Sequence, residues 1–139
     1  VVQAVVLPAG KSIKSLAELK GKKVGGQIGT TGIFVMRKAN AGADIKEYDD
    51  VGLAIQDMLG GRLDAVICDD PVALYYVNKK ADTAGKLNIS FKTEEKEYYG
   101  FTVRQGRKDL VEKLNKGIKE VKASGVEAKL LQKWMGASK

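Results

Sequence analysis

Hydrophobic positions along this 139-residue chain follow two different periods. Short runs of consecutive apolar residues, many of them β-branched, predict strands of a sheet that is covered on both faces. Between these runs, apolar residues recur every three or four positions, which predicts amphipathic helices. The expected strands are Val1–Leu7, Lys23–Gln27, Ile45–Tyr48, Ala65–Cys68, Leu87–Phe91 and Tyr98–Arg104. The expected helices are a short one opened by Ser15, then Ile33–Asn40, one capped by Asp49 or Asp50, one capped by Asp70 with Pro71 at its first position, one along Leu110–Val121, and Val126–Met135.

The order of these elements predicts the fold class. Strand and helix alternate repeatedly, which is typical of an α/β domain with three layers, a parallel-dominated sheet and helices on both faces. Two further helices follow at the C-terminal end. The pair Gly25-Gly26 lies inside an expected strand, where glycine weakens a sheet, so it indicates a close backbone approach or an altered lobe.

Composition narrows the classes of function. A hydrophobic content of 44% suits one soluble core, and no apolar run reaches the roughly 20 residues of a membrane helix. The chain starts with a strand-like segment instead of a cleavable signal, so it is expected to be cytosolic or a mature or trimmed piece. Because there is no histidine and only one cysteine, Cys68, a zinc site, a histidine-based triad and an internal disulfide are not expected.

The net charge of +7 is concentrated near the C-terminus. Residues 104–139 hold ten basic and four acidic side chains, whereas residues 1–103 are nearly balanced. These lysines follow a helical pattern and have no interleaved aromatic residues or glycine-arginine loops. A solvated helix face is therefore expected, and no nucleic-acid partner.

Two strand ends carry the candidate chemistry. The strand Lys23–Gln27 runs into Gly29-Thr-Thr-Gly32, and the strand Ala65–Cys68 runs into Asp69-Asp70. Ligands of open α/β sheets bind beyond the carboxyl ends of the strands. Hydroxyl and backbone N–H groups suit an anion, and carboxylates suit a cation. An amino acid, which carries both charges on neighbouring atoms, is therefore a natural ligand.

Each of these residues also has a purely structural interpretation. Thr30 or Thr31 could cap the helix that follows, and so could either aspartate. Gln27 and Cys68 could be ordinary residues at strand ends. The residue pattern alone leaves these alternatives open.

Five segments in this order resemble the polar amino-acid substrate-binding proteins of ABC importers, the type II periplasmic binding proteins. They are Ser12–Val24, Gly29–Gly32, Gly61–Val66, Tyr99–Arg104 and Leu131–Gly136. The resemblance covers essentially the whole chain. It implies two α/β lobes, joined by two hinge strands, that close on an amino acid.

The resemblance also implies roles for residues of the site. Thr31 would contact the α-carboxylate of the ligand, Asp69 would pair with its α-ammonium, and Gln27 and Cys68 would line the side-chain pocket. The candidate ligand-binding residues are Gln27, Thr30, Thr31, Gly32, Cys68 and Asp69. No cofactor or metal is implied. The implied partners are an amino acid and a membrane permease, and the implied location is the periplasm or the outer face of a bacterial cell.

The resemblance assigns residues 1–103 to a second lobe with both hinge strands and residues 104–139 to a helical tail that packs on a first lobe. That first lobe, with an arginine that clamps the ligand carboxylate, precedes these segments in the family and is absent here. The chain alone is therefore expected to bind weakly. The apolar stripes of the tail are expected to favour a homodimer that exchanges these helices.

Three other classes of function can be compared with the binding of an amino acid. A dehydratase-like enzyme on the same scaffold would need a general acid or base, and only Asp69, Asp70 and Glu47 are available, so no enzyme is expected. A phospho-receiver domain is rejected, because its paired acids would follow the first strand. A non-binding fragment that associates with itself remains an alternative.

Overall fold

The computed structural model describes residues 1–136. The chain divides into two compact units, the first formed by Val1–Glu97 and the second beginning at Tyr98. The first unit therefore ends before the boundary at residue 103 that the sequence suggests.

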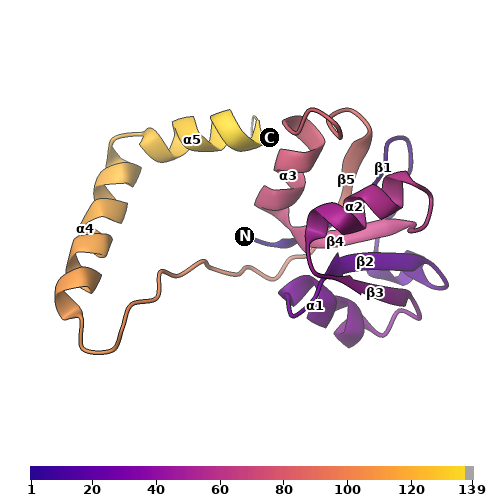
Figure 1. Cartoon of the computed structure of the whole chain (residues 1–139), viewed down its shortest axis with the longest axis horizontal. Coiled ribbons are helices and arrows are strands. Elements are labelled where there is room, and N and C mark those ends of the chain that lie inside the picture. Colours follow the sequence, from indigo (N-terminus) through magenta and orange to yellow (C-terminus); the bar gives the residue numbers. More distant parts are fainter. Residues whose placement is uncertain (137–139) are drawn as a thin grey trace. The chain divides into compact units, whose positions relative to one another are not determined.

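A five-stranded sheet with the order β3-β2-β4-β1-β5 forms the first unit (Figure 1). β2 pairs in parallel with β3 and β4, whereas β1 pairs antiparallel with β4 and β5. The α/β class is confirmed, and the sheet is mixed where a parallel-dominated one was expected. The short η1 connects β1 to β2 without a full crossover helix, so the alternation of elements did not fix the direction of β1. The strands are β1 (Gln3–Pro8), β2 (Lys23–Gln27), β3 (Asp44–Tyr48), β4 (Ala65–Asp69) and β5 (Leu87–Lys92).

Helices cover both faces of this sheet, as predicted. Figure 1 shows α1 on one side of the sheet and α2 and α3 on the other. Because side chains alternate along a strand, Val5 and Leu7 of β1 pack with α1 and η1, whereas Ala4 and Val6 pack with α2 and α3. The helices of this unit are η1 (Leu16–Leu19, a 3₁₀ turn), α1 (Thr31–Ala39), α2 (Val51–Leu59) and α3 (Asp70–Asn78).

Capping residues explain where α2 begins and where α1 and α2 end. Asp50 accepts a hydrogen bond of 2.7 Å from the backbone N–H of Gly52, which makes it the predicted N-cap of α2. The α2 helix ends at Gly60, also as predicted. Asn40 takes a left-handed conformation (φ 44°) directly after α1, a role that asparagine fills with little strain.

The second unit contains two helices, α4 (Lys108–Ala123) and α5 (Val126–Met135). The predicted strand Tyr98–Arg104 is not formed, and no strand within residues 1–136 pairs with this segment. Its aromatic residues are typical of strands, yet Tyr98 is 90% exposed and Phe101 is 74% exposed. Strand propensity reflects packing on a half-buried sheet surface, and these two aromatic side chains are largely exposed. Within residues 1–136, no helix has the length and apolar composition that crossing a membrane requires.

Candidate functional site

The predicted site residues lie together at one edge of the sheet. β2 and β4 are parallel neighbours with Gly25 opposite Val66, so both strands end at this edge. A cavity of about 280 Å³ opens there. It is lined by Gln27, Gly29, Thr30, Thr31, Val51, Ile67, Cys68, Asp69 and Val72, which include five of the six predicted ligand-binding residues.

The first turn of α1 forms the side of the cavity that suits an anion. Thr30 occupies the N-cap position, but its hydroxyl donates to the carbonyl oxygen of Gln27 at 2.7 Å and makes no capping bond. Within residues 1–136, the Thr31 hydroxyl makes no hydrogen bond, so it is available to a ligand. The first N–H groups of any helix also lack partners inside the helix and favour negative charge.

Gly32, the sixth predicted residue, does not line this cavity. It is buried where α1 crosses β1 and β4. A β-carbon at position 32 would lie 3.0 Å from Oε1 of Gln3 and 3.3 Å from Cγ2 of Ile67. The residue thus lets α1 approach the sheet closely, which places Thr31 at the cavity.

Asp69 supplies the carboxylate of the cavity. It precedes α3 at the N-cap position without making a side-chain capping bond, and its Oδ1 accepts a 2.7 Å hydrogen bond from Nε2 of Gln3. The predicted capping role of Asp70 is wrong, because Asp70 is already the first residue of α3. Its carboxylate instead accepts from the backbone N–H of Val2 at 3.1 Å and pairs with Lys92 at 3.2 Å. The two adjacent acids therefore have different surroundings.

Two neutral side chains complete the predicted set. Gln27 donates from Nε2 to the carbonyl oxygen of Asp49 at 3.1 Å. Cys68 is 9% exposed, and burial raises the pKa of its thiol to about 12, with the charges of Asp69 and Asp70 adding to the effect. The thiol is therefore neutral near pH 7 and is a poor nucleophile.

Gln3 is the residue of this region that the sequence analysis missed. It is only 2% exposed, and it lies opposite Asp69 in the antiparallel pairing of β1 with β4. Its Nε2 donates to Asp69 and also to Oε2 of Glu97 at 2.6 Å. One signal was present in the sequence, because Gln3 is the only polar residue in the apolar run Val1–Leu7.

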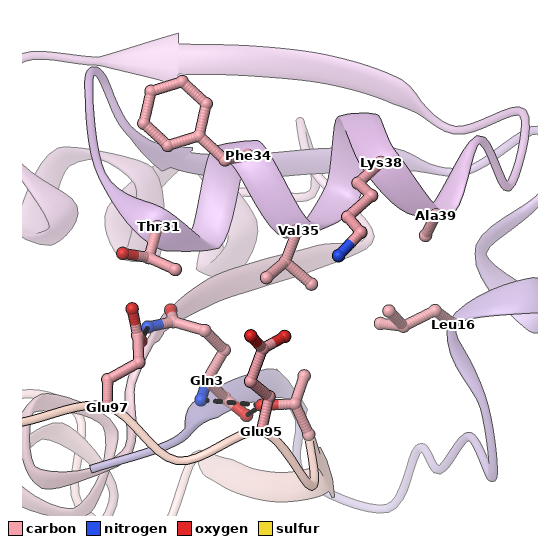
Figure 2. A pocket seen from close by; sticks show the side chains of 10 residues that line it. Gln3, Leu16, Thr31, Phe34, Val35, Lys38, Ala39, Glu95 and Glu97 are labelled. Carbon is pink, nitrogen blue, oxygen red and sulfur yellow. Dashed lines mark hydrogen bonds between the residues drawn. The ribbon is translucent and has the colours of Figure 1, made fainter.

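A second cavity, of about 510 Å³, lies between α1, η1 and the segment that follows β5. In Figure 2, Gln3 and Glu97 lie below Thr31 at one end of this cavity, and Leu16 and Ala39 lie at the other. Thr31 lines both cavities. We place the candidate site in the smaller cavity, because it joins a helix N-terminus and a carboxylate at the carboxyl ends of parallel strands.

A metal centre has no support in the part of the chain that the structure describes. Residues 1–136 contain no cluster of three or more histidine, cysteine or acidic side chains that could hold a metal ion.

The fold is that of one lobe of a type II periplasmic binding protein. The chain belongs to the bacterial extracellular solute-binding proteins, family 3, which it matches over residues 3–137. It is 36% identical to the L-cystine-binding protein TcyJ of Escherichia coli (strain K12) over 137 residues, which cover 98% of this chain and 50% of that protein. The chain spans about half the length of the curated relatives it matches.

Solved structures show the same relationship. An ancestral arginine-binding protein bound to glutamine is 41% identical, with a TM-score of 0.79 over 98% of this chain and 60% of that one. Domain 2 of the arginine-binding protein TmArgBP is 32% identical, with a TM-score of 0.56 over 63% of this chain and 92% of that one. The family resemblance expected from the sequence is therefore confirmed.

Proposed function

We propose that this chain is one lobe of a receptor for an amino-acid ABC importer, and that it holds the α-carboxylate of the ligand at Thr31 and the α-ammonium at Asp69. The observation that carries the proposal is that both residues line a single cavity at the ends of β2 and β4. A carboxylate placed at the start of α1 would meet the Thr31 hydroxyl and the helix dipole. An ammonium beside Asp69 would form a charge-assisted hydrogen bond.

The side chain of the ligand would face Gln27 and Cys68, which also line the cavity. Both are uncharged near pH 7, since the pKa of the thiol is raised to about 12. The names of the relatives, which bind L-cystine and arginine, support an amino acid as the ligand.

The proposed role is binding without catalysis. Among the described residues that line the cavity, the ionisable side chains are Asp69 and the protonated Cys68. The relatives reported above are named as binding proteins, which supports this assignment. The implied partner is a membrane permease of an ABC importer, and the description of the family as extracellular supports a location in the periplasm or on the outer face of the cell.

Binding by the chain alone is expected to be weak. A single lobe contacts one side of the ligand, while association still costs translational and rotational freedom. We therefore choose an experiment that detects weak binding: a two-dimensional NMR titration of the ¹⁵N-labelled chain with each proteinogenic L-amino acid. The expected result is a set of fast-exchange shifts that cluster at residues 29–32 and 68–70.

Matched variants make this titration decisive. Asp69→Asn removes the proposed partner of the ammonium, and Thr31→Val removes the hydroxyl with little change in volume. Asp82→Asn makes the same change of charge at an exposed carboxylate that pairs with Lys80. The first two variants should lose the response and the third should keep it. The proposal fails if no amino acid shifts these residues, or if Asp69→Asn responds like the wild type.

We propose self-association as a second candidate function, because the second unit presents an apolar groove. The groove has a volume of about 860 Å³. Large exposed apolar surfaces mark interaction sites, and a second copy of the same helices would be a suitable occupant because exchange of an element is a low-cost route to a dimer. Among the lining residues are Tyr99, Phe101, Val103, Leu110, Val111, Leu114, Ile118 and Val121.

A further inference from the structure

One amide nitrogen in the first unit lies between two carboxylates. Nε2 of Gln3 donates to Oδ1 of Asp69 at 2.7 Å and to Oε2 of Glu97 at 2.6 Å. A side-chain amide has two N–H bonds, so both are committed to anions, and bonds of this kind are shorter and stronger than neutral ones. Gln3 is 2% exposed, so little water competes for them.

The backbone fixes this arrangement. Gln3 and Asp69 are directly opposed in the antiparallel pairing of β1 and β4, so their side chains project from the same face of the sheet. The segment after β5 is tied to β1 by two bonds at Gln3, namely Gln3 N–H to Thr93 Oγ1 at 3.0 Å and Thr93 N–H to the Gln3 carbonyl at 2.9 Å. A bond of 2.8 Å from the N–H of Glu97 to the carbonyl of Val1 continues this connection.

As a buried side chain, Gln3 reduces the stability of the fold. Its Oε1 is buried and has no hydrogen-bond partner within residues 1–136, and an unsatisfied buried acceptor reduces stability. Val5 and Leu7, which share its face of β1, belong to an apolar cluster instead. The two hydrogen bonds to carboxylates are what Gln3 supplies and an apolar side chain could not.

Glu97 does not face the candidate ligand site. It lines the larger cavity beside Gln3 (Figure 2). Asp69 lines the smaller cavity, and Gln3 is hydrogen-bonded to both carboxylates. We propose that Gln3 is a positioning residue of the ligand site, which holds one oxygen of Asp69 for the ligand ammonium and couples that carboxylate to Glu97. This inference rests on the proposed function, in which Asp69 binds the α-ammonium of the ligand.

A ligand-free NMR measurement tests the coupling directly. The side-chain amide signals of Gln3 are assigned by their loss in Gln3→Met. We expect them to shift in Asp69→Asn and in Glu97→Gln, and we expect Glu97→Gln to shift the carboxyl carbon signal of Asp69 as well. Glu95→Gln is the matched control, because it makes the same charge change in the same segment and cavity, and it should leave these signals in place. An unchanged Asp69 signal in Glu97→Gln would overturn the proposed coupling.

A titration with L-arginine and L-glutamine tests the consequence for binding. Glu97→Gln and Gln3→Met should raise the dissociation constant, measured from the shifts of Thr31 and Asp69, by roughly tenfold. This is about the effect of one charge-assisted hydrogen bond. Glu95→Gln should bind like the wild type. Glu97→Gln keeps the proposal testable if Gln3→Met does not fold. If Glu97→Gln and Glu95→Gln bind equally well, Gln3 has no positioning role. If the wild type binds neither probe nor any other amino acid, the proposed function itself fails, and the ligand-free signals alone decide whether Glu97 and Asp69 are coupled.

Discussion

Gly26 of β2 and Ile33 of α1 lie so close together that a β-carbon at position 26 would stand 2.8 Å from Cδ1 of Ile33. The same β-carbon would lie 3.2 Å from the carbonyl oxygen of Ile67 on the neighbouring strand. Gly25 faces the other side of the sheet, where Leu63 and Ala54 leave equally little space. The close backbone approach that the glycine pair predicted occurs at Gly26, beside the Ile67 carbonyl, whereas the neighbours of Gly25 are side chains.

We therefore expect Gly26→Ala to destabilise the first unit. The added methyl group must displace Ile33 or the backbone of β4, and overpacking of this kind costs about 1–3 kcal/mol. Urea unfolding followed by circular dichroism measures the effect. Gly117→Ala is the control, because a β-carbon there meets no atom within 4 Å and alanine favours a helix interior. Equal stability of Gly26→Ala and the wild type would show that the contact is easily relieved.

Cys68 should react slowly with thiol reagents in the folded chain. Burial raises the pKa of its thiol to about 12, well above the value of about 8.5 for an unperturbed cysteine. The folded state therefore binds an extra proton between these values, so its stability is fully present below the lower one and decreases as the pH rises through this range. Reaction with Ellman's reagent at pH 8 to 9, with and without urea, measures the difference. Equal rates in both conditions would contradict the prediction.

Asp69→Asn should reduce affinity far more than Asp70→Asn in a two-lobed protein that contains this chain. Loss of one partner of a buried charged hydrogen bond costs about 2–5 kcal/mol. Asp70 binds the backbone of Val2 and pairs with Lys92, so its substitution should act mainly on stability. Calorimetric titration together with thermal unfolding separates these effects. Small and equal losses of affinity would remove Asp69 from the ligand site.

Leu114→Asp should abolish self-association if the second unit pairs with another copy. Leu114 lines the apolar groove, and a charge there would have to be buried against the partner. Light scattering over a range of concentrations gives the mass. The exposed Lys116→Gln, which lowers the net charge by one as Leu114→Asp does, is the control for the change of charge. A monomer mass for the wild type, unchanged in Leu114→Asp, would refute the second candidate function.

Local patterns in the sequence were enough to predict much of this structure. The sequence predicts the position of the site, because the ends of adjacent parallel strands lie at the same edge of a sheet. Thr30 and Thr31 follow one such strand, and Asp69 follows the apolar run Ala65–Cys68. What the sequence could not show depends on partners distant along the chain. Three features depend on which segments become neighbours in space: the direction of β1, the contact of Asp70 with Val2, and the missing pairing of Tyr98–Arg104. The period of apolar residues does not indicate which segments these are.

The antiparallel pairing of β1 also has a consequence for how the chain acquires its structure. β1 precedes the other four strands of this sheet along the chain, yet it lies inside the sheet between β4 and β5, with Gln3 opposite Asp69 and Ala4 opposite Lys92. Closing such long loops is entropically costly and slows folding. During synthesis, one edge of β1 can pair only after β4 has been made, and the other edge only after β5, which ends at Lys92.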